Sequence, residues 1–174
     1  MTVIQKQCLL QYLGYYTGAV DGIWGNGSRS AAEAFCREEN IREGDMEKKL
    51  LEAVCREQRD WWQNIRYFTR AEFACKCGKF CDGYPAEPVR ELVELADGAR
   101  AHFGKAGIVV SGLRCATHNA NVGGAAQSRH MSGRAVDLQI RGVSADELLE
   151  YIRKQSGVRY AYKINGTNVH FDVT

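Results

Sequence analysis

Hydrophobic and polar residues alternate along two short stretches in the C-terminal part of the chain. The first stretch, residues 135–140, places apolar residues on either side of Asp137. The second, residues 168–174, does the same around His170 and Asp172. An alternation of period two is typical of a strand with one buried face. We therefore predict two strands whose polar side chains point to the face opposite the core.

Helical periodicity dominates the first part of the chain. Apolar positions recur at helical spacing over residues 4–13. Ser28 is expected to cap a second helix, and Asp45 to cap a third that continues through Arg59. These elements predict a small three-helix domain over residues 1–60.

The rest of the chain mixes helices with strands. Apolar stripes predict one helix after Pro88 and another that begins at Ser144, and residues 108–110 have the pattern of a short buried strand. Residues 158–166 are expected to form a turn into the last strand. The predicted class is α+β: the three-helix domain is followed, over residues 66–174, by an α+β domain with a small, mainly antiparallel sheet.

The boundary between the two predicted domains falls within residues 52–73. No stretch rich in proline, serine or glycine intervenes there, so the linker is short and the domains are expected to touch. Trp61 and Trp62 lie in this region, and we expect them to pack in a core or at the interface.

Composition narrows the possible partners. Of the 174 residues, 45% are hydrophobic and 25% are charged, which is ordinary for a globular protein. A formal net charge of +2 is too small to indicate a nucleic-acid partner. No apolar run approaches the length of a membrane span. We expect a monomer that binds neither nucleic acid nor membrane.

The two alternating stretches also carry the candidate chemistry. If their strands share a sheet, His130, Asp137 and His170 converge, because Gly133 lets the intervening loop fold His130 back over the polar face. Two imidazoles and one carboxylate suit a four-coordinate zinc with one position left for water, the arrangement of a catalytic site. The pattern predicts a zinc hydrolase.

These residues also resemble a known family. Residues 128–137, SRHMSGRAVD, resemble the S-x-H-x-x-G-x-A-x-D motif of the zinc D-alanyl-D-alanine carboxypeptidases, whose relatives include phage endolysins and the hedgehog fold. SGLRC upstream and VHFD downstream occur in the family's order, and FACKCGKFCDG and HNANVGG resemble its endolysin-like branch. The similarity covers residues 68–174. It implies zinc-dependent cleavage of peptidoglycan stem peptides, at D-alanine bonds or at L-alanyl-D-glutamate bonds.

The N-terminal helices carry a second resemblance. Residues 7–36 are similar, in register, to the peptidoglycan-binding domain that is often attached to wall hydrolases. They depart from its pattern at Ser28, where threonine is usual, and at Cys36, where glutamine is usual. The resemblance implies that the partner is peptidoglycan and that the protein acts on the bacterial cell wall. The first residues lack the pattern of a secretory signal, so we expect either release by a phage or prophage or a leader that was removed.

Three further residues are expected to serve the reaction. Arg114 is predicted to clamp a substrate carboxylate or the oxyanion of the intermediate, and Ser128 to contact substrate. Many family members carry the catalytic acid three residues before the second histidine ligand, but Thr167 occupies that position here. Asp172 is therefore predicted to act as the general base or to orient a ligand histidine.

The sequence leaves the roles of several other cysteines and histidines open. The C-x-C-x3-C stretch at residues 75–81, together with Cys115, suits a structural zinc, a disulfide to Cys115 or reduced, buried thiols. His102 is expected at the C-terminal end of a helix, and His118 is not assigned. The alternative to an enzyme is a non-catalytic, zinc-containing module that binds the cell wall.

Overall fold

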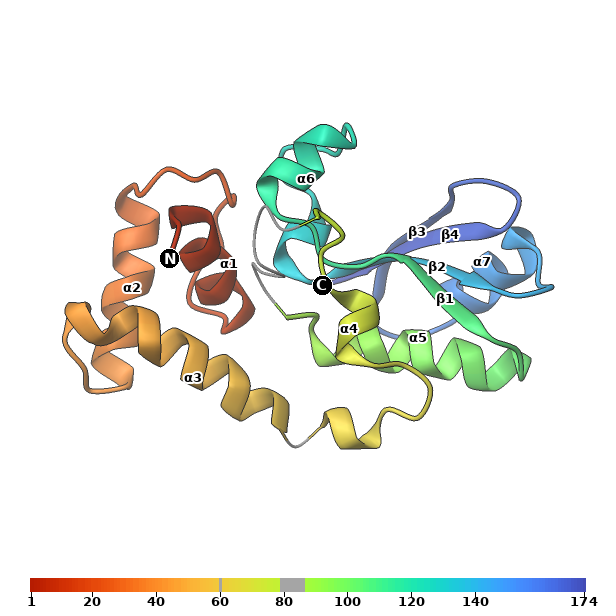
Figure 1. Ribbon diagram of the computed structural model, residues 1–174, viewed down its shortest axis with the longest axis horizontal. Coiled ribbons are helices and arrows are strands. Elements are labelled where there is room, and N and C mark those ends of the chain that lie inside the picture. The colour runs from red at the N-terminus through yellow and green to blue at the C-terminus, as the bar shows by residue number, and fades with distance from the viewer. Residues whose placement is uncertain (60, 79–86) are drawn as a thin grey trace.

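The computed structural model describes residues 1–59, 61–78 and 87–174. Three helices form a unit at the left of Figure 1, and a four-stranded sheet with its own helices forms a second unit at the right. The α-helices are α1 (Val3–Tyr12), α2 (Asn26–Glu38), α3 (Met46–Arg59), α4 (Arg70–Phe73), α5 (Arg90–Phe103), α6 (Ala116–Asn121) and α7 (Ala145–Arg153). The strands are β1 (Gly107–Ser111), β2 (Ala135–Ile140), β3 (Val158–Lys163) and β4 (Asn168–Val173), and the 3-10 turns are η1 (Glu43–Asp45), η2 (Trp62–Asn64) and η3 (Arg129–Ser132). The α+β class is confirmed.

The N-terminal unit has its own apolar core, and one expected cap in it is wrong. Helix α2 begins at Asn26, with Gly25 as its cap residue, so Ser28 lies inside the first turn. The Ser28 hydroxyl instead accepts a hydrogen bond of 3.0 Å from Nε2 of Gln7. Both side chains are buried, so this contact satisfies a polar group that would otherwise be costly inside the core. The core residues are Leu9, Leu10, Tyr12, Ala31, Ala32, Phe35, Met46, Leu50, Ala53 and Val54.

The sheet of the second unit has the order β1-β2-β4-β3, and all of its pairs are antiparallel. The expectation of a turn over residues 158–166 is therefore wrong in part, because residues 158–163 form the edge strand β3. The short strand at residues 108–110 exists as part of β1, but it is not buried throughout. Val109 is buried, whereas Val110 is 37% exposed, since β1 is the opposite edge of the sheet.

Helices α5 and α7 cover one face of the sheet. The odd-numbered positions of β4 and the even-numbered positions of β2 point to these helices and form the main core. The core residues from these elements are Leu92, Val93, Ala96, Ala99, Val136, Leu138, Ile140, Ala145, Leu148, Ile152, Val169, Phe171 and Val173. The opposite face carries the polar side chains of β2 and β4, as the alternation predicted.

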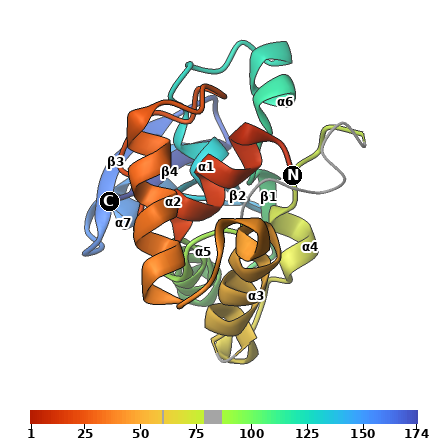
Figure 2. The same ribbon diagram turned by 90° about the vertical axis from the view of Figure 1, so that its left-hand side faces the viewer.

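The two units touch, as the short linker led us to expect. The buried Cys8 thiol in α1 donates a hydrogen bond of 2.8 Å to the carbonyl oxygen of Met131 in η3. Burial raises the pKa of Cys8 to about 12, so this thiol stays protonated and remains a donor at neutral pH. Figure 2 looks onto the N-terminal helices, with the sheet behind them. The N-terminal unit therefore packs against the turn that carries His130.

Trp61 and Trp62 pack in the second unit and do not form an exposed aromatic surface. Their rings stack with centroids 4.7 Å apart, and Trp61 is buried in the main core. Among the described residues, none of the helices has both the length and the apolar character that crossing a membrane requires.

Candidate metal centre and substrate cleft

A sharp reversal of the chain places His130 over the polar face of the sheet. His130 lies in η3, and Gly133 follows it with a φ of 72°, a left-handed conformation that glycine adopts without strain. A Cβ atom at Gly133 would also overlap the carbonyl oxygen of Glu87. Glycine is therefore required here both for its backbone angle and for its small size, in line with the role expected from the sequence.

Gly133→Ala should lower the free energy of unfolding by more than about 1–3 kcal/mol, because it adds left-handed strain and a backbone clash. Gly104→Ala is the matched control, since Gly104 has a φ of 61° and no atom within 4 Å of the added Cβ. Denaturant titration of both variants measures the difference. Equal losses in the two variants would show that the contact with Glu87 contributes nothing.

The three predicted metal ligands lie together. Asp137 and His170 are direct cross-strand partners in the β2–β4 pair, and His130 reaches them from η3. His170 Nδ1 lies 2.8 Å from Asp137 Oδ1, and His130 Nε2 lies 3.3 Å from each of these atoms. The convergence predicted from the sequence is present in the structure.

The hydrogen bonds of His130 leave one of its ring nitrogens available to a metal. His130 Nδ1 lies 2.7 Å from the carbonyl oxygen of Gly112. A carbonyl only accepts, so Nδ1 carries the proton and Nε2 presents its lone pair to the cluster. A backbone carbonyl in this position is a common way to fix the tautomer of a ligand histidine.

The spacing of the donor atoms fits a tetrahedral zinc. Zinc bonds of roughly 2.0–2.1 Å in tetrahedral geometry place neighbouring ligand atoms roughly 3.3 Å apart. The three observed separations are 2.8, 3.3 and 3.3 Å. His130, Asp137 and His170 therefore have both the chemistry and the spacing of a three-ligand zinc site.

Electrostatics keep the carboxylate of Asp137 ionised. Burial opposes its ionisation, but the hydrogen bonds and charges of His130 and His170 outweigh burial and hold the pKa of Asp137 below its usual range. Arg114 donates a further hydrogen bond of 2.8 Å from its guanidinium to Asp137 Oδ2, and its Nε donates to Ser111 Oγ at 2.8 Å. Arg114 thus lies beside the cluster, and its role as a substrate clamp stays a prediction.

Asp172 lies beside His170 and pairs with an arginine that the sequence did not single out. Asp172 Oδ2 is 3.7 Å from His170 Nε2, beyond hydrogen-bond length. Both carboxylate oxygens accept hydrogen bonds from Arg159, at 2.7 and 2.9 Å. The β3–β4 register shifts between Val158 and Tyr160, so Arg159 is the extra residue of a β-bulge that aims its side chain at Asp172.

Strand β3 adds two aromatic side chains to the same face. Tyr162 is paired with His170 and Tyr160 with Asp172, and the rings of Tyr162 and His170 have centroids 4.8 Å apart. Both tyrosines are exposed, with 55% of Tyr160 and 42% of Tyr162 open to solvent. The alternation in VRYAYK was the signal that could have identified this strand and its tyrosines.

A cleft of about 440 Å³ opens above the metal ligands. It is lined by Arg114, Val122, Gly123, Gly124, Ala125, Gln127, Ser128, Arg129, His130, Asp137, Arg159, Tyr160, Tyr162, His170 and Asp172. The residues assigned to the site from the sequence, including Ser128, therefore all line this cleft.

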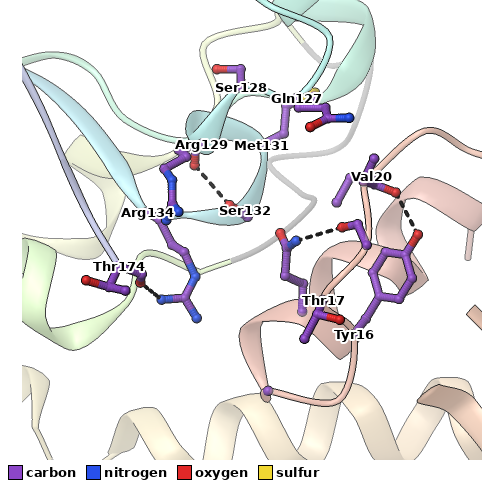
Figure 3. A pocket seen from close by; sticks show the side chains of 14 residues that line it. Tyr16, Thr17, Val20, Gln127, Ser128, Arg129, Met131, Ser132, Arg134 and Thr174 are labelled. Carbon is purple, nitrogen blue, oxygen red and sulfur yellow. Dashed lines mark hydrogen bonds between the residues drawn. The ribbon is translucent and has the colours of Figure 1, made fainter. Parts of the chain in front are cut away.

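A second cavity, of about 370 Å³, lies between the two units. Figure 3 shows Tyr16, Thr17 and Val20 of the N-terminal unit on one side, and on the other side Ser128, Arg129, Met131, Ser132 and Arg134. Residues 127–129 line both this cavity and the cleft. The two hollows are thus adjacent and share one wall.

The remaining histidines lie outside the metal cluster. His102 is near the C-terminal end of α5, as expected, and its ring stacks on Tyr151 with centroids 4.3 Å apart. His118 lies in α6, where burial and then the charge of Arg114 lower its pKa. Cys75, Cys77 and Cys115 gather in a separate group, and Cys81 lies outside the described residues.

Comparison with known proteins agrees with this geometry. The sequence model of the family described as Peptidase M15 matches residues 66–172, which is more than half of the chain. No curated protein matches the chain.

Proposed function

Because the chain belongs to the Peptidase M15 family, a family of zinc-dependent peptidases, we propose that it is a peptidoglycan hydrolase that cleaves stem-peptide bonds. The bond is of the D-alanyl-D-alanine type or the L-alanyl-D-glutamate type. The observation that carries the proposal is the convergence of His130, Asp137 and His170 on the floor of a cleft. A peptide laid across this cleft would bring its scissile carbonyl to the three ligands.

Zinc held by these three side chains would supply a Lewis acid that polarises the scissile carbonyl and makes nearby water more acidic. The protein supplies the remaining groups. Arg114 orients the ionised Asp137 and presents a guanidinium to a substrate carboxylate or to the developing oxyanion. Asp172 accepts the proton of the attacking water, or it holds His170 in place.

Thr167 does not replace the missing acid. It lies in the turn between β3 and β4, and its hydroxyl contacts the side chains of Asn165 and Asn168 at 3.2 and 3.1 Å. A hydroxyl is also far too weak a base at neutral pH. Two carboxylates line the cleft among the described residues: the proposed ligand Asp137 and Asp172. Asp172 is therefore the best-placed base among the described residues.

The N-terminal unit is proposed to hold the enzyme on its polymeric substrate. Its loop at residues 14–20 forms one wall of the cavity that adjoins the cleft. The walls carry hydroxyl, amide and guanidinium groups from Thr17, Gln127 and Arg129, which suit the hydroxyls and carboxylates of a peptidoglycan strand. A strand bound there would pass next to the metal ligands. Action on the bacterial cell wall follows from this proposal.

Digestion of purified peptidoglycan tests the enzymatic proposal. The wild-type protein is expected to release peptide fragments, and a chelator should abolish the release until zinc is restored. Mass spectrometry of the fragments identifies the bond. If the protein binds the polymer but releases no fragments at any zinc concentration, it is a non-catalytic wall-binding module.

Residues 1–60 alone are expected to sediment with insoluble peptidoglycan, because they contain a complete core of their own. Circular dichroism of the isolated segment checks that it is folded, and residues 66–174 serve as the comparison. A folded segment that stays in the supernatant would show that the N-terminal unit has no targeting role.

A further inference from the structure

Three cysteines from two distant segments place their sulfur atoms together outside the cleft. Cys75 and Cys77 follow α4, and Cys115 immediately precedes α6. Their Sγ atoms all lie within 4.8 Å of one another. Cys77 and Cys115 are buried, and Cys75 is half-buried. Such a group is not produced by local sequence, since about forty residues separate its two parts.

Two backbone amides point at these sulfurs. The N–H of Cys115 donates to Cys75 Sγ at 3.2 Å, and the N–H of His118 donates to Cys115 Sγ at 3.3 Å. A sulfur that accepts hydrogen bonds is stabilised as the thiolate, and the thiolate is the form that binds metals. The backbone is therefore arranged around the sulfurs as acceptors.

We propose that Cys75, Cys77 and Cys115 supply three thiolate ligands to a second zinc ion with a structural role, whose fourth coordination position is filled by a further donor such as water. Zinc–sulfur bonds of roughly 2.3 Å in tetrahedral geometry put neighbouring sulfurs roughly 3.8 Å apart, which the observed upper limit accommodates. Clustered thiolates select zinc over the hard cations that prefer oxygen ligands. Each thiol gives up its proton on binding, so three protons are released to solvent.

The position of the cluster indicates what the ion does. Cys115 follows Arg114, and the same segment is tied to the end of α4 by a hydrogen bond of 2.8 Å from Leu113 N to the carbonyl oxygen of Phe73. Gly112, whose carbonyl fixes the tautomer of His130, packs so closely on Phe73 that a Cβ would lie 2.8 Å from its Cα. A zinc ion bound by the cysteines would link residues 112–115 to residues 73–77. It would thereby fix the position of the segment that forms this wall of the cleft.

The experiment measures zinc per chain in full-length protein that lacks the first site. His130→Ala/His170→Ala protein, prepared with zinc under reducing conditions and then desalted, should retain one zinc per chain. Adding Cys115→Ser should reduce this value to near zero, whereas adding Cys55→Ser, in the exposed part of α3, should leave it at one. Absence of zinc from the double-histidine variant would overturn the proposal without bearing on catalysis.

A second measurement on the unaltered chain does not depend on the folding of a variant. Protein loaded with Co²⁺ should show a thiolate-to-cobalt charge-transfer absorption, which histidine and carboxylate ligands cannot produce. Alkylation of the denatured, metal-free protein without a reductant should label Cys75, Cys77 and Cys115. A missing charge-transfer band, or a disulfide among the three, would show that the cluster is not a metal site.

Discussion

His130→Ala and His170→Ala should each lose the zinc of the cleft and on the order of a thousandfold in hydrolysis rate. The two imidazoles supply two of the three ligands, and each is within 3.3 Å of the other donor atoms. A Lewis acid at the reacting carbonyl contributes several kcal/mol to transition-state stabilisation, which corresponds to a loss of this size. Metal content and the rate of fragment release from peptidoglycan are both measured on the purified variants.

His102→Ala is the matched control for these variants. His102 is a histidine on the surface of α5 that stacks on Tyr151, so its loss should leave both the zinc of the cleft and the rate unchanged. Full retention of zinc by both ligand variants would exclude this site. Retention of activity after loss of the metal would exclude the zinc mechanism while leaving the site itself intact.

Asp172→Asn should keep the zinc of the cleft and lose at least ~100-fold in rate, the scale expected for loss of a general base. The amide preserves the shape of the side chain but removes the basic oxygen and weakens the paired hydrogen bonds from Arg159. Steady-state kinetics and zinc affinity, measured on the same preparation, check the prediction. Asp146→Asn is the control, because Asp146 is an exposed carboxylate that pairs with Lys163.

The two measurements separate the two roles of Asp172. A zinc affinity that falls roughly 10–100-fold while activity falls only modestly would assign Asp172 to holding His170, as an outer group around a metal ligand does. Normal affinity together with a normal rate would remove Asp172 from the mechanism, and the base would then have to come from the substrate or solvent.

The convergence of His130, Asp137 and His170 was predictable because it depends on local pattern and on one strand pairing. Alternation around Asp137 and His170 fixed which side chains shared a face, and Gly133 indicated where the chain turned back. The position of Gly133 between His130 and Asp137 was enough to predict that His130 lies close to Asp137 and His170. No comparable signal was needed from the rest of the chain.

The residues that β3 contributes to the cleft were harder to predict from the sequence. Strand β3 is an edge strand in which Ala161 is the one buried residue among those that pair with β4, so its apolar signal is weak. Arg159 reaches Asp172 only because of a bulge, and a bulge depends on the partner strand rather than on local composition. Ser28 was mistaken for a cap because its partner, Gln7, lies in another helix.

The direct pairing of Asp137 with His170 would also couple zinc binding to folding. A slip of β4 by one residue against β2 would turn His170 towards α5 and α7, away from Asp137, and it would move Phe171 out of the core. Misregistered chains would thus lose the ligand set and the core at the same step. Zinc bound by these residues would favour the native register by mass action, and at a hundred times its dissociation constant it would add roughly 2.7 kcal/mol to the folded state. Zinc binding would thus favour chains in which β2 and β4 are correctly aligned, before any substrate binds.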